Sequence, residues 1–246
     1  MMNKTVIFSL GIVCLLVLSS SSFAGWQQLG GNQLAGHPPF MNIVVNSHDE
    51  PLWVDYVKVW QEGSGTVYLE DDFSGAAGPL GALWTPPPAA EGTALLNGSG
   101  QAVLSNAGFT GTPWGNLLKS ASPSATHPGN DTFPAVMLEM HLIFNAGTGT
   151  QQAGFGFGNG LGNAFYVTDD GSLTHVGSVG NNGGVDTGID LVRDGSTIHG
   201  FRIRATAASN GGPKREYYYN ANIPEPATMS LLLLGGVAAL RRRRRS

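Results

Sequence analysis

Glu139 and His141 are the residue pair in this chain whose types and spacing best suit proton-transfer chemistry. They stand two positions apart in the segment 135–144, where polar residues alternate with apolar ones. Because successive side chains of a strand point to opposite faces, both would project from the same face. A carboxylate beside an imidazole can act as a general acid and base or contribute to a metal site. The alternative is a polar pair on the solvated face of an edge or convex strand.

Four aspartates are the candidate metal ligands. Asp71, Asp72, Asp169 and Asp170 supply hard oxygen ligands of the kind that calcium takes. The Asp-Asp-Gly sequence at 169–171 is also a common turn sequence. We therefore expect no resident cofactor, with calcium at these aspartates as the alternative.

Aromatic side chains are the candidate sugar contacts, since their flat faces can stack on sugar rings. Trp114 lies among loop-forming residues in Gly-Thr-Pro-Trp-Gly-Asn and is the tryptophan most expected to be exposed. The other tryptophans and the run 217–219 (Tyr-Tyr-Tyr) are expected mainly in the core, where large aromatics dominate burial. A polysaccharide is accordingly a candidate partner.

Charge and motif content exclude several function classes. Without Lys4 and the five terminal arginines, seven of 13 basic residues remain against sixteen of 17 acids if Glu225 is also removed, a net charge near minus nine. Such a surface repels nucleic acid, whose binding depends on Lys and Arg neutralising phosphates. No Walker-type loop, Gly-x-Ser-x-Gly or Gly-x-Gly-x-x-Gly after a strand is present, which removes support for nucleotide binding and for a nucleophile elbow.

The elements that must position these residues are short strands. No long 3.6-residue apolar period occurs between positions 25 and 222, whereas short alternating runs separated by Gly, Asn, Asp and Pro recur. Asp-Gly pairs at 170–171 and 194–195 predict two hairpins. The fold class is therefore all-β, with strands expected over 40–45, 52–60, 66–69, 101–104, 135–144, 165–168, 173–179, 187–192 and 197–207.

Two local resemblances suggest a specific sandwich. The segments 37–46 and 51–61, with the core Val-Asp-Tyr-Val-Lys-Val-Trp, resemble the closing strand pair of family 16 glycoside hydrolases. The segment 70–75 (Glu-Asp-Asp-Phe-Ser-Gly) resembles the opening of concanavalin-like modules. These resemblances imply a concanavalin A-like jelly roll, with 25–62 as an N-terminal strand pair and 63–222 as the body. The closing strands precede the opening one, as in a rearranged fragment, a permuted sandwich or a truncated protein.

The carboxylate pattern of the resembled glycosidases shows whether this chain has the groups that glycoside hydrolysis needs. Retaining enzymes need two carboxylates about 5 to 5.5 Å apart, and in the resembled family they follow a Glu-x-Asp-x-(x)-Glu pattern on one strand. Glu139 matches the first position, but His141 replaces the middle carboxylate and the last position is apolar. We therefore expect a non-catalytic structural or glycan-contacting protein of the cell envelope or extracellular matrix. The alternative is a degraded or permuted β-glucan hydrolase.

The N-terminal residues predict export. Lys4 precedes an apolar stretch over 6–18, and small residues follow up to Ala24. This order is that of a secretory signal peptide, here 1–24, cleaved before Gly25. Cys14 is the single cysteine and lies inside this segment, so we expect no disulfide and no cysteine metal ligand after cleavage.

The C-terminal segment 223–246 predicts a membrane anchor. An uncharged run over 227–240 would extend about 21 Å as a helix, against a hydrocarbon core of roughly 30 Å. This short transmembrane helix suits transient anchoring in the inner membrane. The five arginines that follow would keep the terminus on the cytoplasmic side, and the anchor residues are Arg241, Arg242, Arg243, Arg244 and Arg245.

The tail also carries a recognisable sorting signal. Pro224, Glu225 and Pro226, the apolar run and the arginine cluster together resemble the PEP-CTERM sorting tail of Gram-negative bacteria. The resemblance implies a membrane protease of the exosortase type as partner, cutting near Pro-Glu-Pro. We therefore expect an exported protein, held transiently at the inner membrane and then transferred to the cell surface or extracellular matrix.

Overall fold

The computed structural model describes residues 25–33, 43–48, 51–85, 87, 92–105, 118–120, 135–145, 152–157, 165–168, 170–175, 184–206, 214–221 and 223. All regular elements in these ranges are strands, so the all-β prediction is confirmed there. The strands are β1 (Gln27–Gln33), β2 (Ile43–His48), β3 (Leu52–Gln61), β4 (Val67–Asp71), β5 (Gly78–Pro79), β6 (Trp84–Thr85), β7 (Thr93–Leu96), β8 (Ala102–Ser105), β9 (Leu118–Ser120), β10 (Val136–Phe144), β11 (Gln152–Phe157), β12 (Phe165–Val167), β13 (Ser172–His175), β14 (Val185–Asp190), β15 (Ile198–Thr206) and β16 (Lys214–Asn220).

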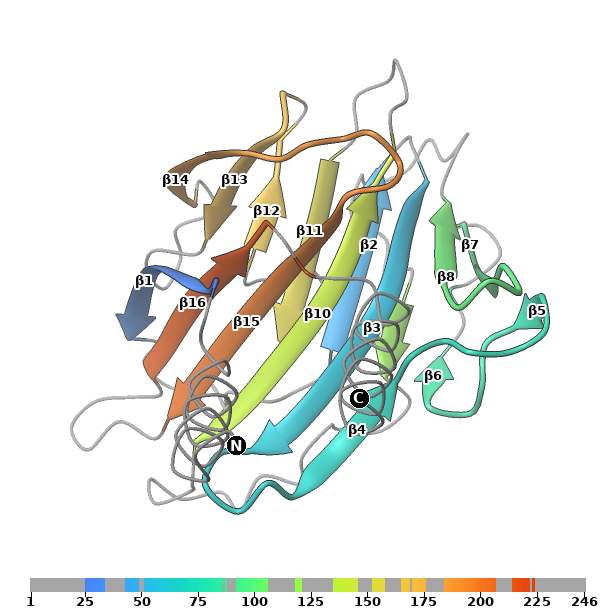
Figure 1. Cartoon of the computed structure of the whole chain (residues 1–246), viewed down its shortest axis with the longest axis horizontal. Helices are drawn as coiled ribbons and strands as arrows, with labels where there is room; N and C mark the ends of the chain where they lie inside the picture. Colours follow the sequence, from blue (N-terminus) through green and yellow to red (C-terminus); the bar gives the residue numbers. More distant parts are fainter. Residues whose placement is uncertain are drawn as a thin grey trace, which may run out of the picture.

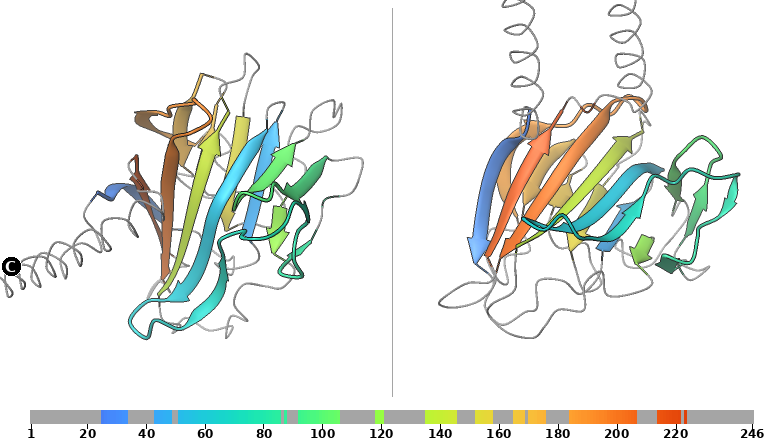
Figure 2. Two further views of the ribbon diagram at one scale, coloured as in Figure 1. Left: turned by 45° about the vertical axis from the view of Figure 1, so that its right-hand side comes forward. Right: turned by 60° about the horizontal axis from the view of Figure 1, so that its bottom comes forward.

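The strands form two antiparallel sheets that lie one behind the other (Figure 1). The first has nine strands in the order β1-β16-β15-β10-β3-β8-β7-β5, with β4 pairing to the second half of β3. The second has seven, in the order β14-β13-β12-β11-β2-β9-β6. Figure 2 shows the same layers from two further directions, with the green β7 and β8 at the end of the first sheet opposite to the blue β1. The described strands therefore build a β-sandwich.

Alternating side chains fill the space between the sheets. On β10, Leu138, Met140, Leu142 and Phe144 are at most 1% exposed, as the sequence predicted for one face of this strand. Aromatic rings make the contact across the layers, because the Phe201 ring centroid of β15 lies 4.6 Å from that of Phe155 on β11. Burial of these rings supplies the main driving force for the two-layer arrangement.

The two predicted hairpins have different outcomes. β12 and β13 precede and follow the Asp-Asp-Gly sequence and pair in antiparallel register from Phe165–His175 to Val167–Leu173, so this hairpin is confirmed. The prediction of a hairpin at 193–195 is wrong, because β14 pairs with β13 whereas β15 pairs with β10 and β16. Asp194 and Gly195 do form a turn, but that turn carries the chain from one sheet to the other.

The N-terminal strands contribute to both sheets. β2 pairs with β11 and β9 in the second sheet, whereas β3 pairs with β10, β4 and β8 in the first. The two segments expected as a strand pair are thus consecutive but do not pair with each other. The described strands that the sequence missed are β1, β5, β6, β7, β9, β11 and β16.

Candidate functional site

Glu139 and His141 lie together on the outer face of β10, as the alternation predicted. His141 Nε2 donates a hydrogen bond to Glu139 Oε1 over 2.7 Å. Both side chains are largely buried, with 12% of Glu139 and 14% of His141 exposed. β10 lies between β15 and β3, so of the two alternatives, an edge strand or a convex strand, the edge strand is excluded. The neighbouring strands can therefore supply further partners to this pair from both sides.

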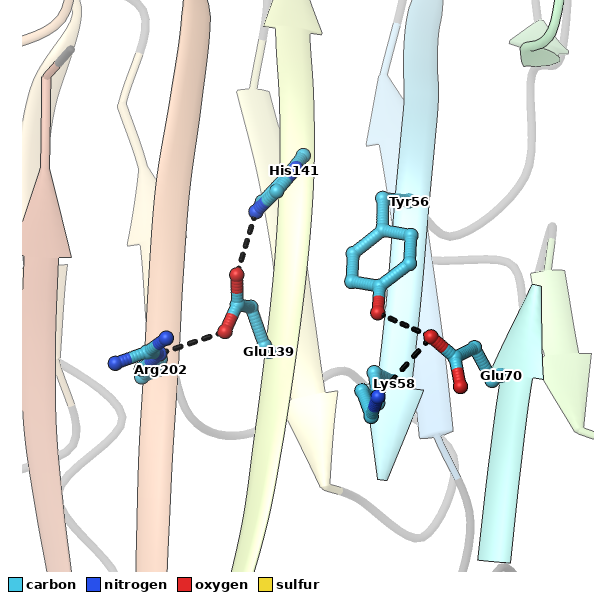
Figure 3. A network of polar contacts seen from close by, with 6 residues as sticks. All are labelled: Tyr56, Lys58, Glu70, Glu139, His141 and Arg202. Carbon is cyan, nitrogen blue, oxygen red and sulfur yellow. Dashed lines mark hydrogen bonds and ion pairs between the residues drawn. The ribbon is translucent and has the colours of Figure 1, made fainter. Parts of the chain in front are cut away.

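Arg202 on β15 is the first of these partners. It is the register partner of Glu139, and its Nε donates to Glu139 Oε2 over 2.7 Å (Figure 3). The guanidinium also lies over the Trp26 ring, 4.0 Å from the ring centroid. A cation placed so close to an aromatic face is held by the ring quadrupole as well as by the carboxylate. The Glu139 carboxylate and the Trp26 ring together therefore fix the position of the Arg202 side chain.

The electrostatics keep Glu139 ionised. Burial by itself would raise the pKa of this carboxyl group, but the hydrogen bond from His141 and the positive charge of Arg202 outweigh burial and hold the pKa below its ordinary value. A general acid must carry a proton at its working pH, whereas this carboxylate is an acceptor for two donors. The geometry assigns Glu139 the role of an anchor for the two side chains beside it.

Tyr56 on β3 and Glu70 on β4 form a second polar cluster between these two strands (Figure 3). The Tyr56 hydroxyl donates to Glu70 Oε1 over 2.6 Å, and Lys58 Nζ donates to the same oxygen over 3.1 Å. Burial and the bond to Glu70 both raise the pKa of Tyr56. The Tyr56 ring centroid lies 5.0 Å from that of His141, its register partner on β10. Ring contact thereby joins the two polar clusters across the sheet face.

An open groove of about 850 Å³ lies over this face. β10 supplies the floor through Glu139, His141 and Ile143. Residues within 72–74 and 99–101 form a wall on the β3 side, and residues within 195–198 form a wall on the β15 side. Serine hydroxyls, one glutamine amide and the Tyr56 phenol line it together with carboxylates. This combination offers many hydrogen-bonding groups around one aromatic ring.

A bulge in β3 brings Asp55 into the groove. Opposite β10, the register passes from the pair His141–Tyr56 to the pair Leu142–Val54, so Asp55 has no opposing residue. An extra residue of this kind bends its strand and redirects its own side chain. Asp55 lines the groove beside Tyr56 and lies 3.5 Å from the Gln101 amide nitrogen. Its carboxylate is a groove group that the sequence pattern did not indicate.

The candidate calcium ligands do not gather in the described part of the chain. Asp71 accepts from the Phe73 backbone N–H over 2.8 Å and from Trp84 Nε1 over 2.6 Å. Asp170 accepts from the Thr168 hydroxyl over 2.6 Å in the turn between β12 and β13. Asp72 lines the groove, and Asp169 lies outside the described residues. No group of three or more His, Cys, Asp or Glu side chains suited to a metal ion occurs within the ranges that the structure describes.

The aromatic candidates separate into three groups. Tyr217 and Tyr219 are at most 6% exposed and belong to the core, as expected for most large aromatics. Tyr218 is partly exposed on the outer face. Trp114, expected as the exposed tryptophan, lies outside the described residues, as do the sorting residues 224–226 and the arginine cluster 241–245.

The site residues that were not predicted include Asp55, Arg202, Tyr56 and Trp26. In the sequence, Arg202 and Arg204 alternate with apolar residues, which indicates a polar face on β15. No local signal pairs Arg202 with Glu139, because 63 positions separate them. Trp26 was expected mainly in the core with the other tryptophans, and no sequence feature singled out Tyr56 as a site residue.

Comparisons with known proteins bear on the tail of the chain. Neither the curated proteins nor the solved structures give a match, so no relative supports the resemblance of the body to family 16 glycosidases or concanavalin-like modules. Among the described residues no helix is long and apolar enough to cross a membrane. Residues 222–245 match the PEP-CTERM protein-sorting motif, which confirms the sequence interpretation of the tail. This motif indicates an exported protein whose tail anchors it transiently in the membrane. A sorting enzyme of the exosortase type then processes the tail, and the protein is released to the cell surface.

Proposed function

We propose that the surface-released body is a non-catalytic module that contacts a glycan through the groove over β10. The observation that carries this proposal is the groove lining, in which the Tyr56 ring lies among hydroxyl, amide and carboxylate groups. Sugars present hydroxyl groups around apolar C–H faces, so they suit a concave site with one aromatic and several polar groups. The protein would serve as a structural or glycan-contacting component of the envelope or extracellular matrix.

The state of Glu139 supports a binding role over a catalytic one. The carboxylate accepts from His141 and Arg202 and has a lowered pKa. A retaining glycosidase needs one protonated carboxyl group and one nucleophilic carboxylate at close range. On β10 the other outer-face residues near Glu139 are Met137, His141 and Ile143. The strand therefore supplies a single carboxylate.

The groove charge favours a neutral or amino-bearing glycan. Asp55, Asp72 and Glu139 line the groove, and among the described residues none of its lining side chains is a lysine or arginine. An acidic polysaccharide would meet like charge here, and such juxtaposition costs affinity. A cationic amino sugar would find complementary charge.

A degraded or permuted β-glucan hydrolase of concanavalin A-like jelly-roll fold is the second candidate. The observation in its favour is that Asp55 and Asp72 bring further carboxylates to the groove from other segments. This candidate predicts turnover of laminarin or a related glucan that disappears in Glu139→Gln. A binding module shows no such turnover.

The deciding experiment is a glycan array with the exported protein, run with and without calcium. Reducing-sugar release is measured in parallel from each polysaccharide that the protein retains. Retention of neutral or amino-bearing glycans without release supports the proposal. Release that depends on Glu139 would favour the hydrolase, and absence of any retention would leave a purely structural surface protein. A calcium requirement would assign a role to the aspartates.

A further inference from the structure

The chain enters and leaves the sandwich at one place. β1 pairs in antiparallel register with β16, and Gln27 is the partner of Tyr219 (Figure 1). Before β1, a Cβ built on Gly25 would lie 3.0 Å from the Asn220 side chain. The residues just before the first strand and just after the last strand are therefore neighbours.

Trp26, just before β1, and Ile223, just after β16, both contact Gly200 on β15. A Cβ at Gly200 would lie 2.7 Å from Ile223 Cδ1 and 2.8 Å from Trp26 Cη2. Real Cβ atoms do not approach other heavy atoms so closely, so both apolar side chains rest on the bare Cα of this glycine. We call this contact of Trp26, Gly200 and Ile223 the exit clasp. It holds Ile223 partly buried although no strand includes that residue.

The exit clasp contains a residue of the sorting motif. The motif spans 222–245, so Ile223 belongs to it and is followed directly by Pro224. Consecutive Cα atoms are about 3.8 Å apart, which keeps Pro226 within roughly 11 Å of Ile223. Among the described residues, the sorting motif therefore contacts the folded body through Ile223.

Access to a segment docked in this way depends on local opening. Proteases act on chain that can leave its folded contacts, and their rate follows the population of the open form when opening and closing are fast. Docking of Ile223 lowers that population for the residues beside it. We propose that the exit clasp controls access of the exosortase-type enzyme to Pro224, Glu225 and Pro226, so that the folded body sets the rate of its own release from the membrane. Trp26 also contacts Arg202 beside the groove, but the conversion of the precursor is measured without a glycan, so this inference can be tested separately from the glycan role.

Gly200→Ala is the sharpest test, because it leaves the motif sequence intact. The added methyl group must displace Ile223 and Trp26. The full-length precursor is produced in cells that carry the sorting enzyme, and its conversion to the processed form is followed by pulse–chase labelling. We expect conversion about fivefold faster than for the unaltered protein. Losing roughly half of the burial of one isoleucine would raise the population of the undocked tail by about this factor.

Gly81→Ala is the matched control. No atom lies within 4 Å of a Cβ at Gly81, so the same chemical change occurs in open space. Its conversion rate should equal that of the unaltered protein. Equal rates for Gly200→Ala and Gly81→Ala would overturn the proposal.

A second variant separates the exit clasp from general destabilisation. Ile223→Ala removes the docked side chain without crowding β15, and hydrogen exchange is measured on the exported body of each variant. Faster exchange confined to residues 220–223, together with faster conversion, supports the proposal. Faster conversion of Gly200→Ala accompanied by faster exchange in β10, with an unchanged rate for Ile223→Ala, would assign the effect to global unfolding and overturn it.

Discussion

The Glu139 carboxylate on β10 accepts a 2.7 Å hydrogen bond from Arg202 Nε on β15, because antiparallel register places the two residues opposite each other. The same carboxylate accepts from His141 on its own strand. One acid thus ties a cation from the neighbouring strand to an imidazole that lines the groove. We therefore expect the shape of the groove floor to depend on this carboxylate being present and charged.

Glu139→Gln should destabilise the fold more than Glu70→Gln does. The Glu139–Arg202 pair is largely buried, with 12% and 16% of the side chains exposed, so removing the acid leaves a desolvated guanidinium without its carboxylate. We expect a loss of about 2 to 3 kcal/mol in the free energy of unfolding. The Lys58–Glu70 pair is more exposed, at 28% and 44%, and its loss should cost less than about 1 kcal/mol. Urea denaturation of both variants checks the comparison, and equal losses would contradict it.

The Tyr56 ring should matter more for glycan binding than its hydroxyl group. The hydroxyl is directed to Glu70 over 2.6 Å, which leaves the ring as the groove contact. Tyr56→Ala should weaken the affinity for a retained glycan about fivefold, and Tyr56→Phe less than twofold, since an aromatic contact contributes roughly 1 kcal/mol. Isothermal titration calorimetry measures both. Unchanged affinity of Tyr56→Ala would place the glycan elsewhere.

The sequence predicted the strands that carry the site but not the contacts between them. Apolar and polar residues alternate in the middle of β10 and in the second half of β15, which indicates a strand in each place and identifies its two faces. β16 (Lys214–Asn220) was missed, because Tyr217, Tyr218 and Tyr219 are uniformly aromatic although their burial alternates. β1 was missed because Gln and Gly fill most of it. Both missed strands form the edge at which the tail leaves the body.

Local turn chemistry also has a limit that the 193–195 segment illustrates. An Asp-Gly pair reports a chain reversal of a few residues and carries no information on which strands then pair. The Gly195 N–H donates to the Phe144 carbonyl over 2.9 Å, so the turn is fixed to the end of β10 in the first sheet. Long-range pairing of this kind depends on the whole sandwich, which explains why a hairpin was predicted in place of a crossover.

Gly195→Ala should loosen this crossover. Gly195 has φ of +73°, a left-handed conformation, and an added Cβ would lie 3.3 Å from the Trp53 ring. A left-handed conformation costs a residue with a Cβ about 1 to 2 kcal/mol. We expect the free energy of unfolding to fall by that amount. Thermal or urea unfolding provides the measurement, and Gly81→Ala, in open space, is again the control that should change little.

His199 should make the stability of the sandwich fall as the pH drops below about 6.5. The side chain is fully buried. Its Nε2 donates to the Val192 carbonyl over 2.7 Å, so Nδ1 accepts from the Tyr219 hydroxyl over 2.8 Å and the neutral ring has both partners. Burial lowers the pKa from the ordinary value of 6.5, against the opposing effects of the Val192 bond and the Asp194 charge.

Below pH 6.5 the unfolded chain therefore binds a proton at His199, whereas in the folded chain this histidine stays neutral to a lower pH. The free energy of unfolding has the full contribution of neutral His199 above pH 6.5 and decreases below it by at most about 1.4 kcal/mol per pH unit. The contribution of Glu139 to the free energy of unfolding also decreases as the pH falls, but it does so at a lower pH than that of His199. Its pKa lies below 4.5 in the folded chain, so its contribution is present above that value and is lost only in more acidic solution. Urea midpoints are measured from pH 5 to pH 8, where the contribution of His199 changes and that of Glu139 does not. His199→Gln, which does not titrate, should flatten the dependence between pH 5 and pH 7, and an unchanged slope in this variant would assign the dependence to another group.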